Sequence, residues 1–254
     1  MILVVDVGNS NTVFGVYIKD VLAETWRIQT GSHQTSDELG LTVCGLMAAD
    51  CIDYRDIQKT VIASVVPSLK KTWEGFCRKY LHDAPRWAEA SNLSLMPVRC
   101  ANPAEVGADR LVNAIAAYHR YQTGLIVIDF GTATTFDVVS EAGEFLGGAI
   151  SPGIGISADA LHQRTAKLPR LEVFSSPPSA IGRDTMESIR SGVVFGYAGL
   201  VDGMVRRIRA ELASELKVIA TGGLAPAMQG VSETIAAVEP DLTLKGLKII
   251  ADRL

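Results

Sequence analysis

Two aspartates end apolar stretches of this 254-residue chain, and each is followed two positions later by a glycine. The segments read DVGNSNTVFGVY at residues 6–17 and DFGTATTFDVVS at residues 129–140. Glycine permits a tight bend in which several backbone N–H groups face one concavity, a geometry that binds anions. A carboxylate beside such a bend can hold a hydrated Mg²⁺ that phosphate oxygens also coordinate. The pattern therefore indicates phosphate chemistry at Asp6 and Asp129.

The alternative is that Gly8 and Gly131 are ordinary turn residues, with the two aspartates bonded to the turn backbone. An aspartate at the end of an apolar strand is costly unless it lies at the mouth of a site, so two at matching positions favour binding. The copies begin at residues 6 and 129, which are 123 positions apart. Such a long interval indicates two related halves rather than an array of short repeats.

Regular elements must position these motifs, and the hydrophobic pattern predicts where those elements lie. All-apolar stretches indicate strands buried on both faces, and apolar residues at helical spacing indicate amphipathic helices. The predicted strands span residues 1–7, 12–18, 21–29, 60–66, 125–130, 145–150 and 217–223. The predicted helices span residues 36–49, 68–81, 102–118, 184–213 and 244–253, with one more after the turn SPGIG at 151–155. Ser36 and Asn102 are the predicted N-caps of their helices.

This order of elements indicates an α/β fold. The first strand is nearly all apolar and two more strands follow it directly, which predicts a meander that begins with a central strand. The irregular stretch 83–100 contains Pro85 and Pro97 and is the predicted link between an N-terminal half, 1–100, and a C-terminal half, 101–254.

Composition excludes several classes of function. The formal net charge is -4 and the pI is about 5.6, so no basic footprint for nucleic acid is expected. No apolar run has the length of a membrane span and no basic flank of a signal peptide opens the chain, so we expect a cytoplasmic protein with no membrane contact. The four cysteines and four histidines lack metal-site spacing, and the cysteines are expected to be reduced thiols.

The two commonest nucleotide loops, Walker A and GxGxxG, are missing after the strands. Paired Asp-x-Gly hairpins in two halves, with a later strand ending in Gly222-Gly223, resemble the superfamily of acetate and sugar kinases, actin and the heat-shock ATPases. The resemblance implies two duplicated ribonuclease-H-like halves with a cleft between them. It assigns ATP phosphate binding to Asp6, Gly8, Asn9, Ser10 and Asn11 in the first motif and to Asp129, Gly131, Thr132, Ala133 and Thr134 in the second. Gly222 and Gly223 fall in its adenosine region.

Three further segments narrow the resemblance. NPAEVGADRLVNAIAAYHRY at 102–121, IDFGTATTFDVV at 128–139 and GGAISPGIGIS at 147–157 are similar to the type III pantothenate kinases, from Met1 to the last helix. That family implies transfer of the ATP γ-phosphoryl group to pantothenate, which gives phosphopantothenate in the first step of coenzyme A biosynthesis. It also implies Mg²⁺ at Asp6, a monovalent cation (K⁺ or NH₄⁺) or Mg²⁺ at Asp129, and a homodimer.

The most specific piece of the resemblance is Gly107-Ala108-Asp109-Arg110. Phosphoryl transfer to an alcohol needs an acceptor for the hydroxyl proton, and Asp109 is the candidate. Adjacent residues of a helix do not face each other, so Arg110 can hold the pantothenate carboxylate while Gly107 admits the substrate close to the backbone. The alternative is a pair of surface charges near a helix N-terminus. Thr185 matches a family threonine that reaches the neighbour's substrate, although a hydroxyl in a first helical turn explains it nearly as well.

Two departures from the family concern the substrate wall. Cys100-Ala101 stands where relatives often carry Tyr-Asp, and SNLSLMPVR at 91–99 lacks the usual Lys-Thr-Gly. The Cys100-Ala101 departure leaves open a kinase for another small hydroxy acid. The resemblance itself leaves open a catalytically weak nucleotide-binding regulatory protein, because some relatives act as accessory factors in gene regulation. Because Asp6, Asp109 and Asp129 are all present, the enzyme is favoured.

Overall fold

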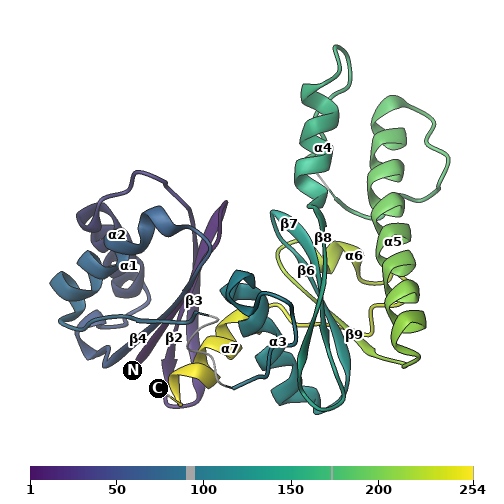
Figure 1. Cartoon of the computed structure of the whole chain (residues 1–254). Coiled ribbons are helices and arrows are strands. Elements are labelled where there is room, and N and C mark those ends of the chain that lie inside the picture. Colours follow the sequence, from purple (N-terminus) through teal and green to yellow (C-terminus); the bar gives the residue numbers. More distant parts are fainter. Residues whose placement is uncertain (90–94, 173, 254) are drawn as a thin grey trace. The chain divides into compact units, whose positions relative to one another are not determined.

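A computed structural model describes residues 1–89, 95–172 and 174–253 (Figure 1). The chain forms two compact units. Unit 1 contains residues 1–97, 101–116 and 242–254, and unit 2 contains residues 98–100 and 117–241. The units do not coincide with the predicted halves 1–100 and 101–254, because residues 101–116 and 242–254 pack within unit 1. As halves of a duplication, the two ranges stay a prediction.

Unit 1 is built on a five-stranded sheet in the order β3-β2-β1-β4-β5. Its strands are β1 (Ile2–Val7), β2 (Asn11–Ile18), β3 (Val21–Gln29), β4 (Lys59–Ser64) and β5 (Arg86–Trp87). β1 lies in the middle, antiparallel to β2 and parallel to β4, which confirms the predicted meander from a central strand.

The helices of unit 1 pack on both faces of this sheet. They are α1 (Ser36–Ala49), α2 (Lys70–Phe76), α7 (Leu242–Ala251) and the first part of α3 (Ala108–Tyr121). Short 3-10 turns lie at Tyr54–Asp56, Pro67–Leu69 and Pro103–Glu105, and a π-helical turn lies at Cys77–Leu81. The helix predicted over 68–81 is therefore three successive segments rather than one.

Two predicted helix starts were wrong. The N-cap of α1 is Thr35 rather than Ser36: the Thr35 hydroxyl accepts from the Glu38 amide at 3.2 Å, while Ser36 donates to the carbonyl of Thr72. The helix expected from Asn102 begins at Ala108, because the 3-10 turn at Pro103–Glu105 ends in an extended residue and the Asn102 side chain caps nothing.

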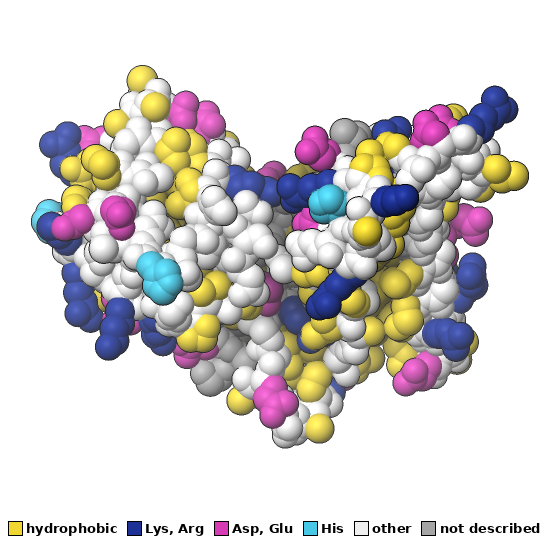
Figure 2. Space-filling model, turned by 90° about the horizontal axis from the view of Figure 1, so that it is seen from above, with side chains coloured by type: hydrophobic (Ala, Val, Ile, Leu, Met, Phe, Trp, Pro, Cys, Tyr) yellow, Lys and Arg dark blue, Asp and Glu magenta, His cyan; other side chains and the backbone are white. Residues whose placement is uncertain are grey.

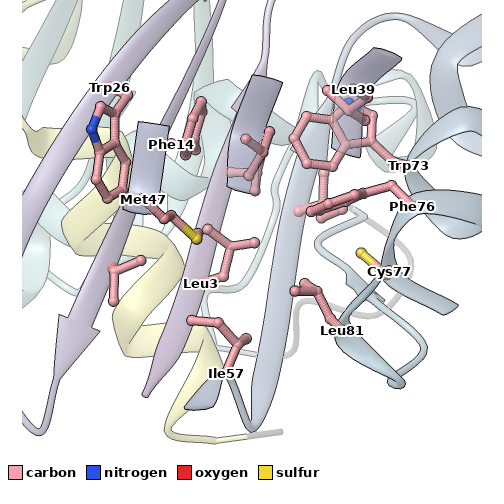
Figure 3. Close-up of a cluster of buried hydrophobic side chains, with 14 of the residues drawn as sticks. Leu3, Phe14, Trp26, Leu39, Met47, Ile57, Trp73, Phe76, Cys77 and Leu81 are labelled. Atoms are coloured by element: carbon pink, nitrogen blue, oxygen red, sulfur yellow. The ribbon is translucent and has the colours of Figure 1, made fainter. Parts of the chain in front are cut away.

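The main core of unit 1 lies between the sheet and the helices α1 and α2 (Figure 3). Leu3, Val5 and Val7 of β1 point into it, and all three are fully buried. Phe14 stacks on Trp26 with ring centroids 5.2 Å apart. Because side chains alternate along a strand, Val4 and Asp6 face the opposite side of the sheet.

Unit 2 repeats this architecture. Its sheet has the order β10-β9-β6-β7-β8, with strands β6 (Leu125–Phe130), β7 (Ala133–Val139), β8 (Phe145–Pro152), β9 (Lys217–Thr221) and β10 (Ala237–Val238). Its helices are α4 (Ile154–Gln163), α5 (Thr185–Leu212) and α6 (Ala225–Met228), together with the end of α3. β6 takes the place of β1, antiparallel to β7 and parallel to β9. This repeated topology confirms the predicted α/β class with two duplicated ribonuclease-H-like halves.

Counting along both segments from their aspartates predicts that Thr12 corresponds to Thr135, and the strand register corrects this alignment by one residue. Val7 pairs with Thr12 across the first hairpin, whereas Phe130 pairs with Thr134 across the second. The second turn is one residue shorter, so Thr12 corresponds to Thr134 and not to Thr135. Burial agrees, since Thr12 and Thr134 are both buried.

Charged side chains of both signs are spread over the surface. On the face drawn in Figure 2, Lys and Arg side chains lie interspersed with Asp and Glu side chains. Within the described part of the chain, no helix has both the length and the apolar character needed to cross a membrane.

Candidate active site

The first phosphate motif is the turn between β1 and β2. The Gly8 amide donates to the Asn11 carbonyl at 3.1 Å, and a Cβ atom at Gly8 would lie 2.9 Å from that oxygen, which explains the glycine. Asn9, Ser10 and Asn11 are exposed. Thr30, which follows β3, was missed by the sequence reasoning: its amide donates to Ser10 O at 3.1 Å and its hydroxyl to Gly8 O at 2.8 Å. Thr30 therefore fixes the shape of the turn.

In the predicted substrate motif, Gly107 directly precedes α3, and Ala108, Asp109 and Arg110 form the first turn of that helix. Asp109 is half-buried, and its Oδ1 accepts from the Arg110 amide at 2.8 Å. A Cβ atom at Gly107 would lie 2.6 Å from that Oδ1, so a larger residue would displace the carboxylate. Burial raises the pKa of Asp109, and the Arg110 amide and charge oppose this rise without cancelling it. The site thus holds a carboxylate that is more basic than usual.

Unit 1 brings this motif to the same side of the sheet as Asp6. Gly15, which pairs with Val4, faces Leu244 of α7, so α7 covers the face on which Asp6 lies. α3 packs on α7 so closely that a Cβ atom at Gly246 would lie 2.3 Å from the Val112 carbonyl oxygen. The first phosphate motif and the start of α3 therefore belong to one compact unit and one face.

The second phosphate motif is the turn between β6 and β7. The Gly131 amide donates to Ala133 O at 3.0 Å, and the Gly153 amide donates to Thr132 O at 3.1 Å. A Cβ atom at Gly153 would lie 2.3 Å from the Thr132 carbonyl oxygen and 2.5 Å from that of Gly131. Gly153, which precedes α4, is a second supporting residue outside the predicted motif; the sequence signals only its turn, SPGIG.

Gly222, the first glycine after β9, lies against Asp129. Thr221 pairs with Asp129 across the parallel strands, and Gly222 has a φ of 91°. A Cβ atom at Gly222 would lie 2.4 Å from the Asp129 Oδ1, so the side chain of Asp129 occupies the space beside this glycine. Unit 2 thus gathers Asp129, residues 131–134 and residues 222–223 at one end of its sheet.

Asp202 of α5 anchors the segment that follows these glycines, and the sequence had no signal for it. Its carboxylate accepts from the hydroxyls of Ser232 and Thr234, both at 2.7 Å, and from the amides of Glu233 and Thr234, both at 3.1 Å. Burial acts to raise the pKa of Asp202, but these bonds outweigh it and leave the pKa lowered. The segment from Gly222 to Thr234 is therefore fixed at both ends, at Gly222 by packing against Asp129 and at Thr234 by the hydrogen bonds to Asp202.

Thr185 lies at the N-terminus of α5, away from the turn residues of unit 2. Asp184 is the N-cap of that helix and accepts from the Glu187 amide at 2.7 Å. The exposed Thr185 lines a groove of about 970 Å³ between α4 and α5, together with Pro152, Ser157, Ser188 and Tyr197. The sequence motif SPGIGIS therefore contributes residues to the same groove as Thr185.

The departures from the family are only partly visible. Cys100 is half-buried, and its Sγ faces the backbone of Gly147. Residues 91–94 of the other departing segment lie outside the described residues. All four cysteines are free thiols, as expected.

Each phosphate motif offers one carboxylate, which suits a hydrated metal ion better than an ion coordinated by protein groups alone. Among the described residues, no three His, Cys, Asp or Glu side chains cluster to hold an ion. Mg²⁺ typically keeps several waters and binds through one or two carboxylates plus substrate phosphates. One aspartate in each motif, Asp6 and Asp129, matches that requirement.

The close approach of Gly153 to the second motif generates a prediction. Gly153→Ala is expected to lower the melting temperature by several degrees, because the new Cβ must displace two carbonyl groups of the turn, and steric strain of about 1–3 kcal/mol is typical. Gly155→Ala is the matched control two positions later, where no described atom outside the helix's own backbone lies within 4 Å of an added Cβ. Thermal unfolding of both variants checks this; equal melting temperatures would contradict the packing described.

Comparisons with known proteins agree with the motifs. A family model described as type III pantothenate kinase matches residues 2–207. A type III pantothenate kinase of Desulfosudis oleivorans is 54% identical over 250 residues, which cover 98% of each chain. Another from Desulfatibacillum aliphaticivorans is 54% identical over 254 residues, covering 100% of this chain and 99% of the relative.

A solved structure shares the fold at low identity. The activator of the 2-hydroxyisocaproyl-CoA dehydratase from Clostridium difficile, with bound ADPNP, has a TM-score of 0.57 and 13% identity, covering 98% of this chain and 93% of that one. The family model and the relatives decide the assignment: this chain belongs to the type III pantothenate kinase family.

Proposed function

We propose that this chain transfers the γ-phosphoryl group of ATP to the hydroxyl of pantothenate, with Asp109 as the proton acceptor. Family membership supports the reaction, whose product, phosphopantothenate, begins coenzyme A biosynthesis. The role of Asp109 rests on one observation: a half-buried carboxylate held in place by the Arg110 amide at the start of α3. Both substrates are metabolites of the cytoplasm, where we expect the protein to act.

The residues around Asp109 bind the acceptor substrate. Arg110 pairs with the pantothenate carboxylate, since a guanidinium offers two parallel donors to such a group. Gly107 and Ala108 have small or no side chains, which allows the substrate to approach the backbone. The raised pKa makes the ionised form of Asp109 a stronger base than an ordinary aspartate.

ATP binds through the two glycine turns. Backbone N–H groups and hydroxyls of Gly8, Asn9, Ser10 and Asn11 and of Gly131, Thr132, Ala133 and Thr134 contact its phosphates, and Gly222 and Gly223 lie on the adenosine side. Asp6 holds a hydrated Mg²⁺, and Asp129 holds a monovalent cation, K⁺ or NH₄⁺, or a second Mg²⁺. These ions neutralise charge on the transferred phosphoryl group.

The chain acts as a homodimer through α5. Thr185, Ser188, Gly192, Gly196, Gly199 and Gly203 recur at intervals of three and four residues and so share one face of this helix. Within the described residues, no atom other than the helix's own backbone lies within 4 Å of a Cβ added at any of these four glycines. Each glycine in a helix interior costs about 0.5–1 kcal/mol relative to alanine, and close approach of a partner helix would offset that cost. Thr185 of one copy then reaches the substrate of the other.

Replacement of the proposed base tests the reaction directly. Asp109→Asn is expected to lower kcat by about 10²–10⁴-fold, the usual contribution of a general base, while ATP affinity is retained. Asn can still accept from the Arg110 amide, so the turn keeps its geometry. Asp37→Asn, in the first turn of α1, is the matched control for a carboxylate near a helix start. The assay follows pantothenate phosphorylation with and without K⁺, beside a panel of other hydroxy acids.

Stability gives the same variant an internal check. The pKa of Asp109 is raised in the folded state, so its ionised form opposes folding at neutral pH and its protonation at lower pH relieves that cost. Asp109→Asn should therefore melt no earlier than the parent protein at pH 7. Substantial turnover by Asp109→Asn would remove Asp109 from the role of base.

The pH profile provides a separate prediction. Because the base must be ionised, kcat/KM is expected to fall as the pH drops through the raised pKa of Asp109, with a midpoint above the ordinary aspartate value of about 3.9. The measurement is the initial rate at subsaturating pantothenate from neutral to acid pH. A profile that stays flat down to ordinary aspartate values would contradict a buried base.

The dimer is tested at the open glycine face. Gly196→Leu is expected to shift the protein toward monomer and to lower turnover, because the new side chain fills the space for the partner helix. Gly45→Leu is the matched control: among the described residues, only the helix's own backbone lies near a Cβ added there, but Gly45 belongs to α1 of unit 1. Sedimentation analysis and the kinase assay report the two effects. A fully active monomer would refute the proposed role of the partner.

A further inference from the structure

We infer that Tyr197 is a positioning residue for ATP: its hydroxyl holds the turn at Pro152–Gly153 against the second phosphate motif. The inference rests on the proposed function only in assigning phosphate binding to Gly131–Thr134. No substrate contact is required of Tyr197, which acts through the backbone of Gly153.

The first step runs from α5 to the turn. The Tyr197 hydroxyl lies 3.0 Å from the Pro152 carbonyl oxygen and 3.2 Å from that of Gly153. It is also hydrogen-bonded to the Ser157 hydroxyl in the first turns of α4. A phenol has one proton, so Tyr197 donates to one carbonyl at a time and can accept from Ser157. One side chain thereby fastens the end of β8 and the start of α4, which lies beside α5 (Figure 1).

The second step runs from the turn to the phosphate motif. Gly153 donates its amide to Thr132 O at 3.1 Å and packs against the carbonyls of Thr132 and Gly131 with no room for a Cβ atom. A displacement of Gly153 would therefore move the Gly131–Thr132 peptide directly. Only one backbone residue separates the Tyr197 hydroxyl from the residues expected to contact phosphate.

The duplicated unit explains why a tyrosine is needed. In unit 1 the corresponding residue is Thr30, whose amide donates to Ser10 O at 3.1 Å, as the Gly153 amide does to Thr132 O. Thr30 also fixes its own turn, because its hydroxyl donates to Gly8 O and bonds to Thr12. Gly153 has no side chain with which to do this. The hydroxyl that steadies the end of the third strand comes instead from Tyr197 on α5.

Tyr197→Phe removes only this hydroxyl and keeps the ring. Calorimetric titration with Mg-ATP is expected to show about three- to tenfold weaker binding, the range for one lost neutral hydrogen bond. The KM for pantothenate should stay within about twofold of the parent value. Amide hydrogen exchange at Gly131 and Ala133 should become faster, because their turn loses its support. Ser157→Ala should change ATP affinity in the same direction by a smaller factor.

Tyr118→Phe is the matched control. Its hydroxyl donates to Glu141 O at 3.1 Å in the same unit, on the β7–β8 connection rather than at the phosphate motif. Its ATP affinity should equal that of the parent protein. An unchanged ATP affinity in Tyr197→Phe, an equal loss in Tyr118→Phe, or a change confined to the KM for pantothenate would each overturn the inference.

The titration separates this inference from the proposed reaction, since it needs no phosphoryl transfer. If the parent protein binds ATP but does not phosphorylate pantothenate, the proposed acceptor is wrong and the comparison of Tyr197→Phe with Tyr118→Phe still decides the role of Tyr197. If the parent protein binds no ATP, the inference fails with the nucleotide site.

Discussion

The structure depends on one constraint: an aspartate near the end of a strand that is buried on both faces needs polar surroundings for its carboxylate. Val4 and Val5 of β1 and Val127 and Ile128 of β6 are fully buried, yet each strand reaches an aspartate near its end. The carboxylate has such surroundings only if the strand ends where the chain leaves the sheet and turns into solvent. Its parallel neighbour, β4 or β9, ends at the same edge. The glycine turns, and in unit 2 the Gly222-Gly223 segment, therefore collect around the aspartate.

Duplication repeats this arrangement, but the two copies stabilise it differently. In unit 1 the turn is supported from within the sheet, by the hydroxyl of Thr30. In unit 2 the turn is shorter by one residue and the backbone of Gly153 presses against it, so support comes from a helix. The second copy thereby couples the turn that is predicted to bind phosphate to α5, the helix whose small-residue face is open. The two units thus share one topology, but different elements support the corresponding turn in each.

Several features oppose stability in ways that suit phosphoryl transfer. Asp109 is half-buried with its pKa raised, so its charge is disfavoured in the folded state. α5 carries four glycines at which an added Cβ atom would meet no described atom within 4 Å apart from the helix's own backbone. Asp202 shows the contrast, because its buried carboxylate is satisfied by four hydrogen bonds, two from side-chain hydroxyls and two from backbone amides, and holds the segment 232–234 in place. The buried charge of Asp109 and the open glycines of α5 are not compensated within the fold, and they lie where a ligand or partner is expected. Strain at functional sites is commonly placed in this way.

The sequence alone determined the class of fold, the central strands and the family. These follow from local patterns: apolar runs that specify buried strands, and an Asp-x-Gly bend that occurs twice. The bounds of β6 were predicted correctly for this reason, and the start of α3 was not. Asn102-Pro103 has the residues of a helix start, yet a 3-10 turn forms there and α3 begins only at Ala108.

Only the tertiary structure decided which residues support the site. The one-residue offset between the turns emerged from strand register, and the roles of Thr30, Tyr197 and Asp202 emerged from contacts between distant segments. The physical reason is how far apart in the sequence the interacting residues lie. A hydrophobic period or a glycine bend is encoded by neighbours in the chain, whereas a hydroxyl that bonds a carbonyl 44 residues away is specified only once packing has placed both.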